Sequence, residues 1–312
     1  MEYILLIIGF VLLIKGADFF VDGASSIAGK LKVPSLIIGL TVVSMGTSLP
    51  EAAVSISASI NGDNAISLGN VIGSNFFNFL MVVGISSIIF PIATDNAVVK
   101  RDMPINICVT ALLFAVLLDG ELSRIDAALL LVIFAAYMFI LFKSALKNRI
   151  EDDEKKVLSW FKSIVFVVVG VAAIIGGGQL VVNNAKTIAI NLGMGETLVG
   201  LTVVAIGTSL PELVTSIVAA KKGESGIAMG NVVGSNIFNI LFILGMTGVI
   251  SPLSANPEFY IDAAILIAVS FLMLIFAFTK KETSRVEGAF CVALYTLYTA
   301  YIIMRAFHVW IF

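Results

Sequence analysis

The hexapeptide Gly-Thr-Ser-Leu-Pro-Glu occurs twice in the chain, at residues 46–51 and 207–212, each time inside a long apolar segment. Such a segment is expected to cross a membrane as a helix, and a charged side chain near the bilayer centre costs roughly 2.5–3.5 kcal/mol. Glu51 and Glu212 therefore carry a combined cost of about 5–7 kcal/mol. A bound cation would offset this cost, so the repeated motif points to a cation site inside the membrane.

The composition places the rest of the chain in the membrane as well. Of the 312 residues, 59% are hydrophobic and 13% are charged, and the mean hydropathy is +1.06. These values exclude a soluble globular protein. The alternating pattern of a membrane β-barrel is absent. We therefore predict an all-α polytopic membrane protein.

Ten apolar segments reach the length that a membrane-spanning helix needs, about 17–25 residues. They lie near residues 2–26, 33–60, 64–92, 103–119, 124–146, 161–187, 195–221, 225–251, 258–279 and 287–307. The sequence therefore predicts ten transmembrane helices.

An internal repeat relates the two halves of the chain. An offset of 161 residues aligns residues 39–51 with 200–212 at eleven of thirteen positions. The same offset aligns residues 69–78 with 230–239 at eight of ten positions. Two blocks at one offset indicate a duplication.

The duplication predicts the domain organisation. Each half contains five spans, and because five is odd, the second half enters the membrane from the opposite side. We therefore predict two inverted five-helix repeats, residues 1–146 and 161–312, with a cytoplasmic connector at residues 147–160. Inverted repeats of this kind occur in secondary transporters, whose sites lie near mid-membrane between the repeats.

The distribution of basic residues predicts the orientation. The connector side holds Lys30, Lys32, Lys100, Arg101, Lys143, Lys147, Arg149, Lys155, Lys156, Lys162, Lys221, Lys222, Lys280, Lys281 and Arg285. The opposite side holds Arg124, Lys186 and Arg305. By the positive-inside rule the connector lies in the cytoplasm. We expect an integral plasma membrane protein with both termini extracellular.

A polar face runs along each segment that carries the hexapeptide. Positions i, i+3, i+4, i+7 and i+11 share one face of a helix. These positions are Ser44, Thr47, Ser48, Glu51 and Ser55 in the first segment, and Ala205, Thr208, Ser209, Glu212 and Ser216 in the second. Because such a face cannot point at lipid, it is expected to line the bundle interior or a water-filled cavity.

Pro50 and Pro211 interrupt the same segments. Proline has no N–H to donate to the carbonyl four residues earlier, and its ring pushes that carbonyl aside. Backbone oxygens near residues 44–46 and 205–207 are therefore free to bind a cation. A simple proline kink without a ligating role is the alternative interpretation.

The second block of each repeat supplies a further polar face. Every fourth residue is polar, at Asn70, Ser74 and Asn78 and at Asn231, Ser235 and Asn239. Nearby glycines allow close approach of helices. Hydrogen bonding between helices is the simpler interpretation of one such face, but its duplication opposite the glutamates favours cation ligation.

The ligand set indicates a hard cation, because neither block contains His or Cys. Six to eight oxygens in a somewhat flexible cage suit Ca²⁺ better than Mg²⁺, and Na⁺ can share the same oxygens. Zinc and copper are disfavoured. The transported ions are therefore expected to be Ca²⁺ and Na⁺, with no other cofactor.

The paired blocks GTSLPE and GNVIGSN/GNVVGSN resemble the α-repeats of the calcium/cation antiporter superfamily, specifically its prokaryotic sodium/calcium exchanger branch. The resemblance covers essentially the whole chain. It implies a mid-membrane diamond of four ligating side chains, shared between one Ca²⁺ site and several Na⁺ sites. It also implies that the first and sixth spans slide to switch access.

Carried over position by position, the resemblance assigns a role to each site residue. Glu51 and Glu212 are the implied central Ca²⁺ ligands, assisted by backbone oxygens of Thr47 and Thr208, and Asn78 and Asn239 complete the diamond. Ser48, Ser74, Ser209 and Ser235 are implied Na⁺ ligands, with the carbonyls of Ser44 and Ala205 completing the outer sites.

One position departs from the family pattern. Well-known members have an aspartate where this chain has Asn239, so the site here carries two formal negative charges instead of three. Two charges balance one Ca²⁺ or two Na⁺ ions, and a third Na⁺ would leave an uncompensated positive charge in a low dielectric. We hypothesise a lower stoichiometry or an altered ion selectivity.

The sequence therefore predicts a secondary antiporter that exchanges Ca²⁺ for Na⁺ by alternating access and performs no enzymatic reaction. A proton-coupled exchanger of calcium or another divalent cation is the alternative, since a buried glutamate can carry a proton. A channel is disfavoured because the site is internal to one chain. We expect a monomer in the lipid bilayer, with no nucleic acid partner.

Overall fold

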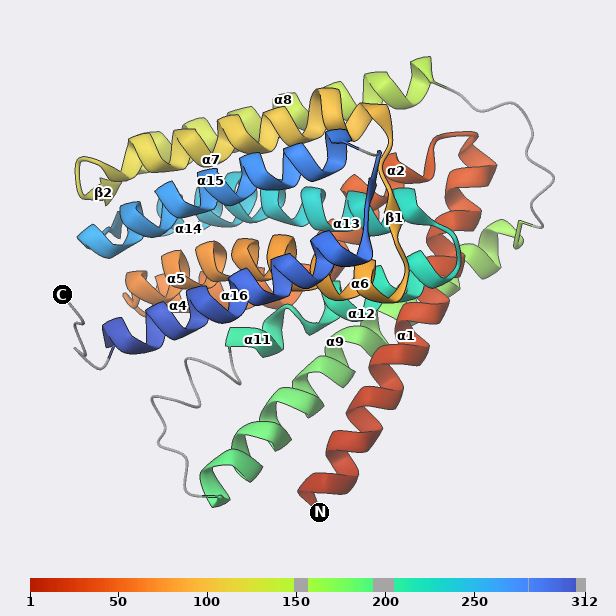
Figure 1. Cartoon of the computed structure of the whole chain (residues 1–312), viewed down its shortest axis with the longest axis horizontal. Helices are drawn as coiled ribbons and strands as arrows, with labels where there is room; N and C mark the ends of the chain where they lie inside the picture. Colours follow the sequence, from red (N-terminus) through yellow and green to blue (C-terminus); the bar gives the residue numbers. More distant parts are fainter. Residues whose placement is uncertain (149–156, 193–204, 280, 307–312) are drawn as a thin grey trace.

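The computed structural model describes residues 1–148, 157–192, 205–279 and 281–306, which form a bundle of helices (Figure 1). The helices up to the connector are α1 (Glu2–Leu31), α2 (Ser35–Ile38), α3 (Ser44–Thr47), α4 (Leu49–Ile60), α5 (Asn64–Phe76), α6 (Val83–Ile89), α7 (Met103–Leu117) and α8 (Arg124–Lys147). Those after it are α9 (Trp160–Asn191), α11 (Ala205–Thr208), α12 (Leu210–Lys221), α13 (Ser225–Phe238), α14 (Leu244–Ile250), α15 (Pro257–Thr279) and α16 (Arg285–Ala306).

Short π-helical segments join or precede several of these helices. Within the described residues they are η1 (Gly39–Val43), η2 (Phe77–Val82), η3 (Val98–Asp102) and η5 (Asn239–Ile243). A π-helical turn carries an extra residue and re-aims the side chains that follow, and such turns often mark functional sites. Asn78 lies in η2, and Asn239 begins η5.

Most of the predicted spans are present. Seven helices of the described residues are long and apolar enough to cross a membrane, and the bent pair Ser35–Thr47 and Leu49–Ile60 makes eight if it is one span. The predicted span 103–119 contains α7, which has 15 residues. The predicted span 195–221 begins in residues that lie outside the described part. The chain is therefore a polytopic helical membrane protein.

Two pairs of two-residue strands accompany the helices. Strand β1 (Ile92–Ala93) pairs antiparallel with β4 (Glu282–Thr283), and β2 (Glu121–Leu122) pairs antiparallel with β3 (Leu253–Ser254). Where the chain leaves a helix, its backbone groups need new hydrogen-bond partners, and two connections running side by side supply them. An offset of 161 residues converts β1 into β3 and β2 into β4. Each strand therefore pairs across the repeats, as a two-fold relation requires.

The proline-containing segments are interrupted as predicted. Helix α3 ends at Thr47 and α4 begins at Leu49, with a bend of 49° at the break. In the second half α11 ends at Thr208 and α12 begins at Leu210. Pro50 and Pro211 each stand in the first turn of the helix after the break, where the missing N–H costs nothing.

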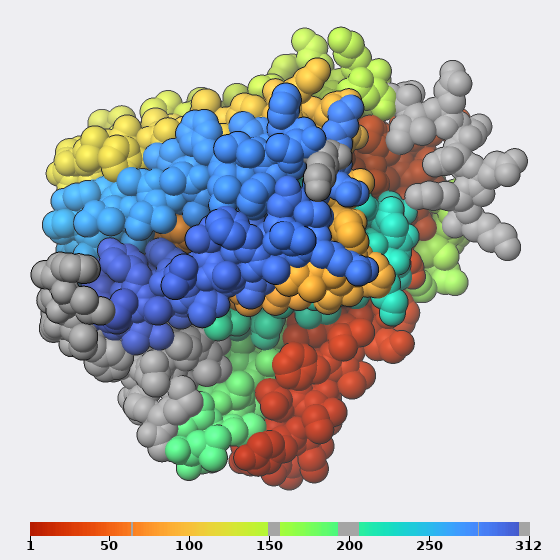
Figure 2. Space-filling view, viewed as in Figure 1, coloured from red at the N-terminus to blue at the C-terminus, as the bar shows by residue number. Residues whose placement is uncertain are grey.

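The centre of the molecule is formed by the helices of the second sequence blocks. The apolar windows of residues 65–89 and 225–250 are 72% and 78% buried, against 11–39% for the other five spanning helices described. Helices α4 and α12 pack on these central helices. Helices α1 and α9 pack along each other and project from the rest of the bundle (Figure 2). The polar sequence blocks therefore lie at the core.

The predicted connector is only partly described. Helix α8 ends at Lys147 and α9 begins at Trp160. Residues 149–156, which include most of the connector's charges, lie outside the described residues.

Candidate cation-binding site

Both glutamates of the repeated hexapeptide are buried. Glu51 is 1% exposed and Glu212 is 0% exposed. Each stands in the first turn of its helix, α4 or α12, directly after the break and the proline. The free N–H groups of a helix N-terminus favour negative charge there. The broken helices therefore place two carboxylates in the interior and give each a favourable backbone environment.

Two serines connect each glutamate to the opposite half of the chain. Ser209 donates its hydroxyl to Glu51 Oε1 at 2.9 Å, and Ser48 donates its hydroxyl to Glu212 Oε1 at 2.8 Å. Ser209 and Ser48 are themselves the break residues before α12 and α4. The two hexapeptides therefore meet, and each satisfies one carboxylate oxygen of the other.

Four buried carboxylate and amide oxygens of the predicted site residues have no hydrogen-bond partner. They are Oε2 of Glu51, Oε2 of Glu212, Oδ1 of Asn78 and Oδ1 of Asn239. A buried acceptor without a partner costs about 1–3 kcal/mol, and more when it is charged. Four such acceptors, two of them on carboxylates, could supply part of the six to eight oxygen ligands that Ca²⁺ takes.

The hydroxyl groups of the second block lie beside these oxygens. Ser209 Oγ is 3.1 Å from Ser74 Oγ, and Ser74 precedes Asn78 by four residues on the same helix. Ser235 donates its hydroxyl to the carbonyl oxygen of Ser44 at 3.4 Å. The structure therefore brings hydroxyls from both halves to the edge of the carboxylate pair.

Asn70 and Asn231 bind the helices of each half together. Asn70 Nδ2 donates to the carbonyl oxygen of Glu51 at 3.1 Å and to Ser55 Oγ at 2.8 Å. Asn231 Nδ2 makes the equivalent bonds to the carbonyl oxygen of Glu212 at 3.3 Å and to Ser216 Oγ at 3.0 Å. These two amides therefore hold each glutamate-bearing helix against the helix of the second block, and the ligating role of this face stays a prediction.

A group of four asparagines lies between the halves, and sequence reasoning assigned only two of them. Asn78 Nδ2 donates to Asn236 Oδ1, and Asn239 Nδ2 donates to Asn75 Oδ1, both at 3.0 Å. Asn75 Nδ2 donates to the carbonyl oxygen of residue 236 at 3.2 Å, and Asn236 Nδ2 to that of residue 75 at 3.4 Å. Asn75 and Asn236 were visible in the sequence as identical residues of the repeated block, but they lie off its every-fourth-residue face.

The two halves of the site are not equivalent in this structure. Thr47 donates its hydroxyl to Asn231 Oδ1 at 2.9 Å, whereas the buried hydroxyl of its counterpart Thr208 has no partner. Ala205 begins α11, and its side chain lies outside the description. One half therefore has an interhelical contact that the other lacks.

Close packing at a glycine closes one side of the site. A Cβ on Gly234 would lie 2.8 Å from Leu40 Cα, because η1 crosses α13 closely there. The side of the site next to α2 and η1 is therefore closed. The segment that corresponds to η1 in the second half, residues 200–204, lies outside the described residues.

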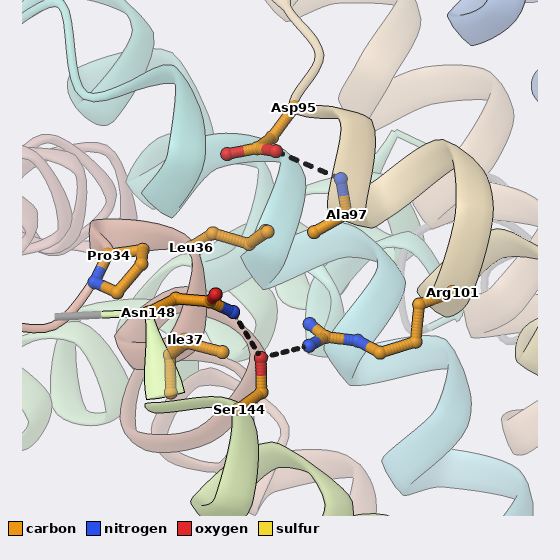
Figure 3. Close-up of a pocket in the computed structure, with 8 residues that line it drawn as sticks. All are labelled: Pro34, Leu36, Ile37, Asp95, Ala97, Arg101, Ser144 and Asn148. Atoms are coloured by element: carbon orange, nitrogen blue, oxygen red, sulfur yellow. Dashed lines mark hydrogen bonds between the residues drawn. The ribbon is translucent and has the colours of Figure 1, made fainter. Parts of the chain in front are cut away.

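A separate cavity of about 270 Å³ lies near the ends of α2 and α8 (Figure 3). Its wall includes Arg101, which donates to Ser144 Oγ at 2.6 Å and pairs with Asp102 at 2.8 Å. None of the predicted site residues lines this cavity. The carboxylates and free oxygens of the core are the stronger candidate site.

These features define a polytopic helical membrane protein with a buried, oxygen-rich site built from two related halves. In the described ranges no group of three His, Cys, Asp or Glu side chains is placed to hold a metal ion. The chain belongs to the family described as sodium/calcium exchanger protein, whose model matches residues 1–143 and 162–304. It is a cation antiporter of this family of transporters.

Relatives and a solved structure extend the similarity over nearly the whole chain. The sodium/calcium exchanger MaX1 of Methanosarcina acetivorans is 37% identical, over 97% of this chain and 98% of the relative. The inner membrane protein YrbG of Escherichia coli is 36% identical, over 89% of each chain. A structure of the sodium-calcium exchanger NCX_Mj, soaked with Na⁺ and Sr²⁺, is 34% identical with a TM-score of 0.85, over 96% of this chain and 98% of that one.

Proposed function

We propose that the chain exchanges Ca²⁺ for Na⁺ across the plasma membrane by alternating access. The observation that carries this proposal is the set of four partnerless buried oxygens on Glu51, Glu212, Asn78 and Asn239. Two carboxylates and two amides supply two negative charges and hard oxygen ligands, which suit one Ca²⁺. The names of MaX1 and NCX_Mj as sodium/calcium exchangers support the same pair of ions.

The serines give the site a means of admitting Na⁺. A serine hydroxyl can donate its hydrogen or present its lone pairs, depending on its rotation. Ser48 and Ser209 donate to the glutamates here. When Na⁺ binds, these hydroxyls, with those of Ser74 and Ser235, turn their lone pairs toward it, and Na⁺ then competes with Ca²⁺ for the same carboxylates.

Backbone oxygens complete the proposed ligand sets. Thr47 and Thr208 end α3 and α11 at the helix breaks, where their carbonyls lack a regular helical partner. The carbonyls of Ser44 and Ala205 serve the outer sites of the two halves. Each repeat then contributes the same kinds of ligand.

The repeats are arranged as two inverted five-helix units, residues 1–146 and 161–312, linked by the cytoplasmic connector 147–160. The crossed strand pairs and the reciprocal serine and asparagine bonds support a two-fold relation between the units. The family model matches two segments separated by the same offset of 161 residues. This arrangement gives ten spans, with both termini extracellular, in a chain that acts as a monomer.

The inequality of the halves supports alternating access. In the proposed orientation α2 and η1 lie in the cytoplasmic half of the membrane, and their close packing on α13 seals that side. Separating η1 from α13 would open the cytoplasmic side, and the equivalent packing in the second half would close the extracellular one.

The charge of the site limits the stoichiometry. Glu51 and Glu212 are its two formal negative charges, because positions 78 and 239 are asparagines. Two Na⁺ ions balance the pair, and a third would add an uncompensated charge in a low dielectric. We therefore expect fewer than three Na⁺ per Ca²⁺.

Flux measurements in proteoliposomes test the proposal. Vesicles loaded with Na⁺ should take up ⁴⁵Ca²⁺, and vesicles with a pH gradient alone should not. Uptake driven only by the pH gradient would establish the proton-coupled exchanger instead, and uptake without a counter-ion would indicate a channel. Uptake driven by an imposed membrane potential as strongly as a three-to-one exchanger requires would contradict the charge argument.

A further inference from the structure

Four asparagine side chains form a closed arrangement between the repeats. Asn75 and Asn78 come from the α5–η2 helix, and Asn236 and Asn239 come from the α13–η5 helix. All four are at most 1% exposed. Buried amides must satisfy both an NH₂ group and an oxygen, so the orientation of each amide depends on its neighbours.

The side-chain nitrogens of Asn75 and Asn236 each donate to a backbone carbonyl of the opposite helix, at 3.2 Å and 3.4 Å. Only their side-chain oxygens are then available to the neighbouring amides. These oxygens accept the NH₂ groups of Asn239 and Asn78, both at 3.0 Å. The oxygens of Asn78 and Asn239 are left buried and without a partner.

We infer that Asn75 and Asn236 are positioning residues that turn the oxygens of Asn239 and Asn78 toward the cation, and that they disfavour a carboxylate at either of those positions. This inference rests on the proposed function, because it concerns the same site. The orientation follows from the direction of the four hydrogen bonds. Without an acceptor at position 75 or 236, the ligand amide is free to present its NH₂ group to the cation, which it repels.

The same hydrogen bonds determine whether positions 78 and 239 can hold an aspartate in place of the neutral asparagine. An aspartate at position 239 would place a carboxylate oxygen against Asn75 Oδ1, where Asn239 now donates at 3.0 Å. Rotating Asn75 to offer its NH₂ group would turn its oxygen toward the carbonyl of residue 236, which its nitrogen now binds. Asn75 and Asn239 therefore act as a pair, as do Asn236 and Asn78, and together they keep the site at two negative charges.

Equilibrium binding of Ca²⁺ to the purified full-length protein tests the orientation. Asn75→Leu and Asn236→Leu should each weaken Ca²⁺ binding by about 10–100-fold, the usual effect of removing a group that orients a metal ligand. Asn106→Leu is the matched control, because Asn106 is a buried amide in α7 that donates to Ser270 Oγ at 3.3 Å and makes no hydrogen bond to the four asparagines. Ca²⁺ binding equal to wild type in folded Asn75→Leu and Asn236→Leu would overturn the inference.

A second variant distinguishes a role of Asn75 in orienting residue 239 from a role in packing. Asn239→Asp alone should weaken Ca²⁺ binding, because its carboxylate faces Asn75 Oδ1. Combining it with Asn75→Leu should restore binding, since a carboxylate presents an oxygen in either orientation and no longer meets an opposing one. A purely structural role for Asn75 predicts the opposite, with the double variant weaker than either single variant.

Binding and transport together distinguish the two proposals. Wild-type protein that binds Ca²⁺ but does not exchange it for Na⁺ would contradict the proposed function and leave the binding test of Asn75 valid. Exchange by wild type, with unchanged Ca²⁺ binding in the leucine variants, would contradict the positioning role alone. Wild-type protein that binds no Ca²⁺ would contradict both.

Discussion

Ser48 donates its hydroxyl to Oε1 of Glu212 at 2.8 Å, across a separation of 164 residues in the chain. The bond is matched by that of Ser209 to Glu51, so neither half of the molecule contains a complete carboxylate site. The two oxygens that these serines leave free have no other partner. Each repeat therefore supplies a hydrogen bond to the buried glutamate of the other.

Replacing either glutamate should abolish exchange. Glu51→Gln or Glu212→Gln removes one of two formal charges from a buried site, where loss of one charged partner costs about 2–5 kcal/mol of binding. Na⁺-driven ⁴⁵Ca²⁺ uptake in proteoliposomes measures the effect. Glu121→Gln, the same change at an exposed position, should leave uptake at the wild-type level. Retained exchange in both site variants would contradict the site assignment.

Ca²⁺ should stabilise the folded protein through the same residues. A ligand present at 100 times its dissociation constant stabilises the state that binds it by about 2.7 kcal/mol. Thermal unfolding in detergent should therefore occur at a higher temperature with Ca²⁺ than with a chelator. Glu51→Gln should lose this difference, whereas Asn106→Leu should retain it. A shift of equal size in Glu51→Gln would place the stabilising ion elsewhere.

The sequence was sufficient to predict the broken helices and the burial of polar residues beside them. Two features predicted the broken helices, which the structure confirms. They are the cost of burying Glu51 and Glu212 and the proline that precedes each glutamate. The duplication at one offset also indicated Asn78 and Asn239 as ligands. The Oδ1 atom of each has no hydrogen-bond partner. These features were predictable because a membrane makes every polar residue in a span informative.

Contacts between the halves could not be predicted in the same way. Asn75 and Asn236 carry no spacing signal, and their role depends on a helix from the other repeat. Nearly identical blocks also cannot specify which half forms a contact that the other half lacks. That choice is a property of the conformation, as the bond of Thr47 and the partnerless hydroxyl of Thr208 illustrate.

This inequality predicts different effects of one substitution in the two halves. Thr47→Val should lower stability by about 1–3 kcal/mol, because it leaves Asn231 Oδ1 buried without its donor. Thr208→Val should cost much less, since the hydroxyl it removes has no partner. Both changes keep the backbone carbonyls that are proposed to bind the cation. Thermal unfolding without Ca²⁺ compares the two variants, and equal losses would contradict the assigned asymmetry.

Arg305 and Asp262 should be strongly coupled. The arginine donates to both carboxylate oxygens, at 3.0 Å and 2.8 Å, and the two side chains are 13% and 5% exposed. Arg305→Met should destabilise the protein by about 3–5 kcal/mol, because it leaves a buried carboxylate unpaired. Combining it with Asp262→Leu should recover most of that loss. A double-mutant cycle of thermal stability measures the coupling, and additive losses would show that the pair is not coupled.

Lys222 should hold the side of the molecule that is closed in this structure. Its Nζ lies 2.7 Å from Asp22 Oδ1 and 3.4 Å from Asp18 Oδ1, and so connects the turn after α12 to α1. The lysine side chain is 28% exposed and the carboxylates 35–47%, so the contact is worth about 1 kcal/mol at most. Lys222→Ala should therefore shift the conformational equilibrium by about fivefold at most toward separation of α1 from this turn.

Spin labels at Leu31→Cys and Ser225→Cys, in a Cys108→Ser and Cys291→Ser background, would report that separation as a longer distance in the Lys222→Ala protein. High salt should produce part of the same change in wild type, because it screens partly exposed charges. Lys186→Ala is the matched control, since Lys186 is exposed and has no ion pair with the described residues. An unchanged distance distribution in Lys222→Ala would show that close packing of α2 and η1 on α13 keeps this side closed without the ion pairs.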